Sequence, residues 1–231
     1  MRSDLKQLRD FYPSPAAKPE ELLQRLGWPN APDLAARYAA LLSPIDFTRY
    51  SPHHRLRLLD VGCGFGLLLD YLKENALLDL IDYTGVDLVD AVLTEARSRW
   101  PNARFEKRDV RDLPYPDDAF DYCIVCGIFT VKVGNTYAET VALAQSTLKA
   151  LWPSVTLGLG FNSMSKHVDW EREDLFHWPL DDIMAFSKRD LSRHVSFRLD
   201  YGLWEVSTLI GKTPRIVAQR VPTAWGEPTS A

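Results

Sequence analysis

Short apolar runs alternate with amphipathic stretches between residues 55 and 161. The runs are typical of buried strands, and the stretches repeat apolar positions every three or four residues, as helices do. The expected strands are 56–61, 83–88, 103–110, 120–126 and 155–161, and the expected helices are 67–74, 91–100 and 137–151. Strands that alternate with helices in this way indicate an α/β fold with a doubly wound, mainly parallel sheet.

The last part of the chain follows a different pattern. A helix is expected over 179–187, followed by strands over 195–201 and 204–210 that only Gly202 and Leu203 separate. Parallel neighbours need a crossover of a dozen residues or more, so these two strands must be antiparallel. The sheet is therefore expected to be mostly parallel with one reversed strand.

The N-terminal region is polar at first and then helical. Residues 1–18 contain Pro13 and Pro15 and are expected to form a flexible arm. Helices are expected over 19–26 and 31–42, and with the connector that follows they suggest a helical lid over 19–50. The main domain would then cover 51–212, and 213–231 would be a C-terminal tail.

Composition narrows the class of protein. The chain has 231 residues, of which 46% are apolar and 25% charged, as in an ordinary globular domain. Its net charge of −4 argues against a nucleic-acid binder, which needs a basic surplus. Three cysteines form no disulfide framework, and the pair Cys123 and Cys126 lies in an apolar strand without a second ligand pair for zinc. The five histidines show no paired spacing, so no metal site is expected.

The sequence shows no signal typical of a membrane or secreted protein. The N-terminus lacks a hydrophobic stretch of signal-peptide length, and no apolar run is long enough to span a bilayer. We therefore expect a cytoplasmic protein with no membrane partner.

The most informative segment is the glycine-rich turn that follows the first strand. It runs from Asp60 through Gly62 and Gly64 to Gly66, and glycines at a strand-to-helix turn let the backbone approach a ligand closely. A dinucleotide fingerprint would need glycine at position 67, where Leu67 stands. Asp60 would repel a pyrophosphate but would suit a cation, such as S-adenosylmethionine with its ammonium and sulfonium groups.

Two further acids lie at the ends of the next strands. Asp87 could hold both ribose hydroxyls of an adenosine, and Asp109 could accept the adenine amino group. The alternatives are a helix N-cap for Asp87 and ion pairs of Asp109 with Arg108 or Arg111. Ligands of open α/β sheets bind at the carboxyl ends of the strands, where both acids are expected.

These segments together resemble the class I S-adenosylmethionine-dependent methyltransferases. The resemblance rests on 58–66, 85–88 and 109–121, the last of which is similar to the D-x-x-x-L-P-[FY]-x-x-x-x-F-D stretch of small-molecule methyltransferases. It covers about residues 55 to 210 and implies a Rossmann-like, seven-stranded sheet with an antiparallel last strand. Segments such as 27–28, 127–129 and 200–201 look like a less-described bacterial branch, whose members often act on surface sugars or secondary metabolites. Cys126 stands where that branch leads us to expect serine.

The resemblance also implies a set of cofactor-binding residues. They are Arg37, Asp60, Gly62, Cys63, Gly64, Gly66, Asp87, Leu88, Asp109, Val110, Cys126 and Gly127. Arg37 would reach the methionine carboxylate of S-adenosylmethionine, although it could also be a plain surface charge. Asp60 could pair with Arg37 or Arg57 and still belong to the site.

The acceptor side is less defined. Methyl transfer is an in-line displacement, and a base is needed only when the acceptor must lose a proton. Candidates near the acceptor are Lys132, Asn162, His167, Asp169, His177 and Tyr201, and we expect His167, His177 and Tyr201 to be catalytic. The aromatic residues around 170–204 are expected to be mostly core.

The expected function is O- or N-methylation of a small molecule, such as a sugar or a secondary metabolite. The alternatives are a nucleotide-cofactor oxidoreductase and a non-catalytic subunit that keeps the fold. The expected partner is the small acceptor, and a homodimer is an open alternative.

Overall fold

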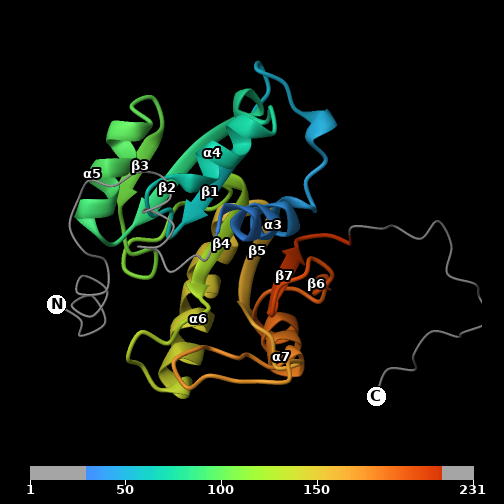
Figure 1. Ribbon diagram of the computed structural model, residues 1–231. Coiled ribbons are helices and arrows are strands. Elements are labelled where there is room, and N and C mark those ends of the chain that lie inside the picture. The colour runs from blue at the N-terminus through green and yellow to red at the C-terminus, as the bar shows by residue number, and fades with distance from the viewer. Residues whose placement is uncertain (1–29, 215–231) are drawn as a thin grey trace, which may run out of the picture.

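Seven strands form one mixed sheet in the computed structural model, which describes residues 30–214 (Figure 1). The strands are β1 (Leu56–Val61), β2 (Ile81–Asp87), β3 (Arg104–Lys107), β4 (Phe120–Phe129), β5 (Val155–Met164), β6 (Val195–Arg198) and β7 (Glu205–Gly211), in the order β3-β2-β1-β4-β5-β7-β6. β7 pairs antiparallel with both β5 and β6. The other neighbouring pairs, which are β3–β2, β2–β1, β1–β4 and β4–β5, are parallel. The predicted fold class is confirmed.

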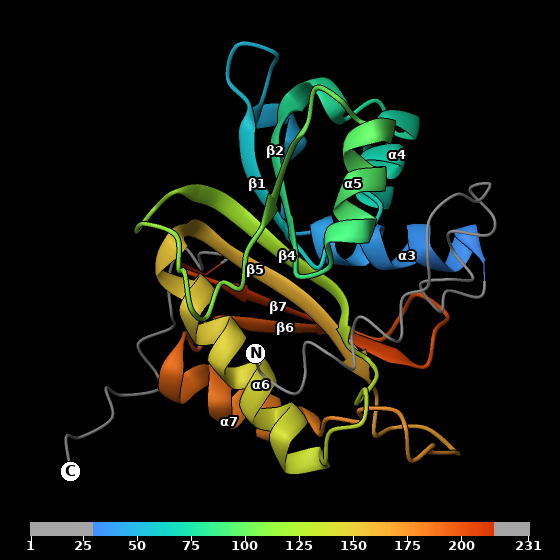
Figure 2. The same cartoon turned by 90° about the vertical axis from the view of Figure 1, so that its left-hand side faces the viewer.

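Helices cover both faces of the sheet, as Figure 2 shows. They are α3 (Ala31–Leu42), α4 (Leu67–Glu74), α5 (Asp90–Arg99), α6 (Tyr137–Leu151) and α7 (Leu180–Asp190), with 3-10 turns at Phe47–Arg49, Leu78–Leu80 and Trp152–Ser154. α3, α4 and α5 pack on one face, and α6 and α7 pack on the other. Successive strand residues point to opposite faces, so Leu58 and Leu59 enter different cores. This double coverage explains why the central strands are almost continuously apolar.

The end of the sheet differs from the sequence expectation in one detail. The strand expected over 195–201 ends at Arg198, because Arg198 binds Asp200 and Gly202 takes a positive φ of 75° in the turn. Residues 199–204 therefore form a loop between β6 and β7. The two strands are antiparallel, as predicted.

The predicted helical lid corresponds, within the described residues, to α3. This helix is part of the core: Leu41 is completely buried, and the Leu41 carbonyl accepts a hydrogen bond from the hydroxyl of Tyr122 on β4 at 3.1 Å. α3 also contacts β5 and β7. The expected arm over 1–18, the helix over 19–26 and residues 215–231 of the tail lie outside the described residues.

Two of the cysteines lie on β4, and Cys63 lies in the turn between β1 and α4. Cys63, Cys123 and Cys126 are buried free thiols, which agrees with the core interpretation of the Cys123 and Cys126 pair. In the stretch from residue 30 to residue 214, no helix combines the length and apolar character needed to cross a bilayer. The same stretch contains no cluster of acids, histidines and cysteines that could hold a metal ion.

Candidate functional site

A cavity of about 210 Å³ opens at the carboxyl ends of β1, β2 and β4. Of the residues expected to bind the cofactor, all except Arg37 and Gly66 line it: Asp60, Gly62, Cys63, Gly64, Asp87, Leu88, Asp109, Val110, Cys126 and Gly127. The parallel topology brings these segments together, because each strand delivers its carboxyl end to the same edge.

The glycine-rich turn passes from β1 to α4 through left-handed backbone. Gly62, Gly64 and Gly66 have φ values of 73°, 52° and 74°. A Cβ at Gly62 would lie 2.6 Å from the Cδ1 and Cγ1 of Ile128, so any larger residue here would clash with that side chain. Gly66 sits at the N-terminus of α4 and serves the turn instead of lining the cavity.

Asp60 is a buried acid that lines the cavity. It is 3% exposed, and the Tyr83 hydroxyl donates a hydrogen bond to its Oδ2 at 2.7 Å. Burial raises the pKa of Asp60 to about 7. Both expected ion-pair partners are engaged elsewhere, Arg37 with Glu205 and Arg57 with Asp121. A cationic ligand would therefore offset the cost of burying this charge.

Asp87 organises the turn with its carboxylate. Its Oδ2 accepts a hydrogen bond from the Gly64 N–H at 3.0 Å, and its Oδ1 accepts from Leu88 and Val89 at 2.7 and 3.0 Å. Burial raises the pKa of Asp87, while these three donors oppose that rise. α5 begins at Asp90 and has no side-chain cap, so the alternative role of Asp87 as its N-cap is wrong.

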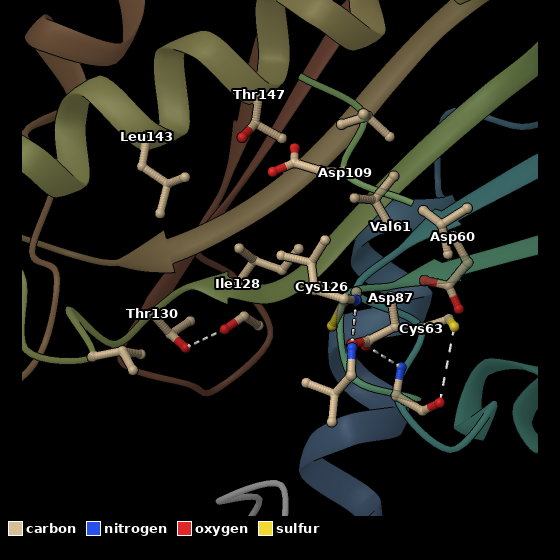
Figure 3. Close-up of a pocket in the computed structure, with 18 of the residues that line it drawn as sticks. Asp60, Val61, Cys63, Asp87, Asp109, Cys126, Ile128, Thr130, Leu143 and Thr147 are labelled. Carbon is tan, nitrogen blue, oxygen red and sulfur yellow. Dashed lines mark hydrogen bonds between the residues drawn. The ribbon is translucent and has the colours of Figure 1, made fainter. Parts of the chain in front are cut away.

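Asp109 lines the same cavity as Thr147 of α6 (Figure 3). The Arg111 guanidinium binds Asp109 at 2.6 Å, and the Arg111 backbone N–H donates to it at 3.0 Å. Arg108 pairs with Glu106 instead. One of the two expected ion pairs is thus present, and Asp109 still borders the cavity.

Arg37 does not line the cavity and pairs with an acid of the last strand in the sequence. It is 5% exposed, so it is not a surface charge. Its guanidinium forms an ion pair with the Glu205 carboxylate on β7, in which Nε donates to Oε1 at 2.9 Å. The hydrogen bond and charge of Glu205 outweigh the effect of burial and raise the pKa of Arg37. Asn162 donates to Glu205 at 2.6 Å and accepts from the Gly127 N–H at 2.7 Å. This buried chain of contacts links α3 to the strand end that lines the cavity.

The expected catalytic residues separate into different environments. His167 is exposed and does not line the cavity, and its backbone N–H donates to the Ser165 hydroxyl at 2.9 Å. The Tyr201 hydroxyl accepts a hydrogen bond from Ser207 at 3.0 Å, and burial raises the Tyr201 pKa. Tyr201 does not line the cavity either. His177 is buried and lines a second, smaller cavity.

Some of the other candidates also lie away from the cavity. Asp169 is exposed, and the Asn162 amide is used within the buried chain described above. The core interpretation of the aromatic residues holds for Phe176 and Trp178, whereas Trp170 and Trp204 are exposed.

Several lining residues escape reasoning from sequence. Leu143 and Thr147 of α6 stand on one side of the cavity, opposite Cys63 and Asp87 (Figure 3). Their spacing of one helical turn is that of any amphipathic helix, so no local signal marks them. Tyr38, the neighbour of Arg37 on α3, also lines the cavity.

Comparisons with known proteins agree with this geometry. A family described as a methyltransferase domain matches residues 58–150. The Mycobacterium tuberculosis protein Rv1506c, named as a methyltransferase, is 32% identical over 66% of this chain and 91% of its own length. A Streptomyces venezuelae dTDP-3-amino-3,4,6-trideoxy-alpha-D-glucopyranose N,N-dimethyltransferase is 27% identical over 57% of this chain, which spans 46% of that enzyme.

Solved structures show the same fold at low sequence identity. The Synechocystis magnesium protoporphyrin IX methyltransferase, solved with bound S-adenosylmethionine, superposes with a TM-score of 0.54 at 13% identity, over 90% of this chain and 91% of that chain. A Leishmania major S-adenosylmethionine-dependent methyltransferase gives 0.55 at 18% identity, over 90% and 82%. The chain belongs to the class I S-adenosylmethionine-dependent methyltransferases.

Proposed function

We propose that this protein binds S-adenosylmethionine in the cavity at the strand ends and transfers its methyl group to a small-molecule acceptor. The observation that carries the proposal is Asp60, a buried carboxylate beside the cavity that has no ion pair within residues 30–214. Bound S-adenosylmethionine supplies an activated methyl group on a cationic sulfur. Asp60 favours that cation and disfavours the pyrophosphate of a dinucleotide, which supports a methyltransferase over an oxidoreductase.

The donor set fits the proposed cofactor. Gly62 and Gly64 expose backbone without side chains, which lets a ligand lie against the turn. Asp87 keeps carboxylate lone pairs beyond its three backbone donors and would hold the ribose hydroxyls. Asp109 would accept the adenine amino group, with Arg111 holding its carboxylate in place.

The acceptor is proposed to be a small metabolite. The sugar N,N-dimethyltransferase of Streptomyces venezuelae and the phthiotriol/phenolphthiotriol dimycocerosates methyltransferase 1 of Mycobacterium ulcerans support this class. The chain spans less than half the length of both relatives, so neither fixes the acceptor atom. A role in secondary metabolism, a cytoplasmic setting and a homodimer stay predictions, as does the contact of Arg37 with the cofactor carboxylate.

Binding measurements test the cofactor assignment directly. Native mass spectrometry and calorimetry on the full chain should show binding of S-adenosylmethionine and S-adenosylhomocysteine but not NAD. Asp87→Asn should weaken binding at least about tenfold, because a hydrogen bond to a charged group contributes roughly 1.5–3 kcal/mol. Asp82→Asn on the same strand is exposed and should bind like the wild type. Preferential NAD binding, or undiminished binding by an Asp87→Asn protein with a normal melting curve, would contradict the proposal.

A further inference from the structure

Residues 174–178 form a short extended segment that is inserted between the ends of β4 and β5. Its backbone pairs on one side with the continuation of β4: Lys132 donates to the Asp174 carbonyl at 2.9 Å, and Phe176 donates to the Thr130 carbonyl at 2.9 Å. On the other side Trp178 donates to the Met164 carbonyl at 3.2 Å. In Figures 1 and 2 this segment lies beside the loop that leads into α6. The segment is thus one strand spacing, about 4.8 Å, from backbone that lines the cofactor cavity.

This segment carries His177 into a second cavity of about 170 Å³. Lys132 lines both this cavity and the cofactor cavity. His177 is only 3% exposed, and the ring of Trp170 packs edge-on against its imidazole with 5.9 Å between centroids. A buried imidazole therefore forms part of the wall of the second cavity, which shares Lys132 with the cofactor cavity.

The hydrogen bonds of His177 define which of its nitrogens is protonated. Its Nδ1 lies 2.7 Å from the Ser165 carbonyl oxygen, which can only accept, so Nδ1 carries the hydrogen. In the neutral ring Nε2 then has a free lone pair. Nε2 is buried and has no hydrogen-bond partner among residues 30–214. Leaving a buried polar nitrogen without a partner is costly, which points to a ligand that binds there.

The charges around the second cavity are largely balanced. Lys166 pairs with Glu171 at 2.7 Å, and Arg172 pairs with Asp174 at 2.5 Å. Lys132 and Glu173, which also line the cavity, bring one charge of each sign. A polar cavity without a dominant charge suits a neutral polyhydroxylated molecule better than a strongly anionic one.

We propose that the second cavity is the acceptor subsite, that it takes a neutral sugar-like molecule, and that His177 is the general base for methylation of one of its hydroxyls. This inference rests on the proposed function. The acceptor oxygen passes its proton to Nε2 and forms a bond to the methyl carbon, while the carbon–sulfur bond breaks and its electron pair stays on sulfur. The Ser165 carbonyl holds the Nδ1–H of the resulting imidazolium, which later releases the proton to solvent.

The tautomer of His177 gives a test that needs no methyl transfer. Histidine labelled with ¹⁵N in the full chain should show the Nδ1–H tautomer at His177, assigned by its loss in His177→Asn. Addition of D-glucose or L-rhamnose should shift the Nε2 resonance of the complex with S-adenosylhomocysteine. An Nε2–H tautomer at His177 would overturn the proposal.

Transfer of labelled methyl groups gives the second test. Full-length protein with methyl-labelled S-adenosylmethionine is offered hexoses, 6-deoxyhexoses and their amino derivatives as probes. We expect a methyl ether, and His177→Asn should slow its formation about 10²–10⁴-fold with unchanged cofactor affinity. Asparagine can still donate to the Ser165 carbonyl, so the fold is kept, and the exposed His53→Asn serves as control.

The outcomes separate the inference from the proposed function. Three outcomes would overturn the assignment of His177 and a sugar hydroxyl. They are an N-methylated amino sugar as the product, a rate of methyl transfer by His177→Asn within tenfold of the wild-type rate, and cofactor binding without transfer to any probe. Failure to bind S-adenosylmethionine would instead overturn the proposed function.

Discussion

Asp60→Asn should make the protein more stable at neutral pH while weakening its hold on the cofactor. The Asp60 carboxylate is 3% exposed, and burial raises its pKa to about 7. Asparagine has the same shape, and its oxygen can still accept the hydrogen bond that the Tyr83 hydroxyl now donates. The substitution therefore removes the charge and little else.

The size and sign of the effect follow from proton linkage. In the unfolded chain the pKa of an aspartate is about 3.9, so between that value and about 7 the folded protein binds more protons at Asp60 than the unfolded chain does. The stabilisation that the protonated form provides is thus lost as the pH rises through about 7. Each pKa unit is worth about 1.4 kcal/mol, so the two units between pH 5 and pH 7 amount to roughly 3 kcal/mol.

Urea denaturation of both proteins at pH 5 and pH 8 measures this difference. The free energy of unfolding of Asp60→Asn minus that of wild type should rise by about 3 kcal/mol between the two pH values. Calorimetry at pH 7.5 should show weaker binding of S-adenosylmethionine by the variant. A difference that is the same at both pH values would refute the raised pKa, and equal cofactor affinity would refute the role of Asp60 toward a cation. Asp82→Asn, at an exposed site, should show neither effect.

Two further substitutions test the packing around the site. Gly62→Ala should lower the free energy of unfolding by more than Gly202→Ala, because both glycines have φ near 75° but only at Gly62 would a Cβ meet a neighbour, Ile128 at 2.6 Å. The backbone cost alone is about 1–2 kcal/mol, and equal losses in urea denaturation would contradict the close approach. Glu205→Gln should cost about 3–5 kcal/mol, because it removes the carboxylate charge from the buried ion pair with Arg37. Asp200→Asn breaks an exposed ion pair and should leave the urea midpoint unchanged; a similar loss in both would show that burial of the Glu205 pair is unimportant.

The sequence by itself determined the fold class and the part of the site that lies on one short segment. The periodicity of apolar positions separated strands from helices. The short spacing between the last two strands required that they run antiparallel. The turn from Asp60 to Gly66 carries its own signal, because glycines in left-handed backbone are a local requirement. Asp87 and Asp109 followed because strand ends of a parallel sheet must share one edge.

Only the tertiary structure decided which distant residues meet. Arg37 and Glu205 are 168 residues apart, and no local pattern links a helix near the start of the chain to the last strand. Leu143 and Thr147 line the cavity because of the rotation of α6 against the sheet, which packing sets. His167 and His177 were equivalent in sequence, yet one faces solvent and the other is buried with a defined tautomer. Their difference arises because residues 174–178 insert between β4 and β5, a pairing between segments that the chain brings together only on folding.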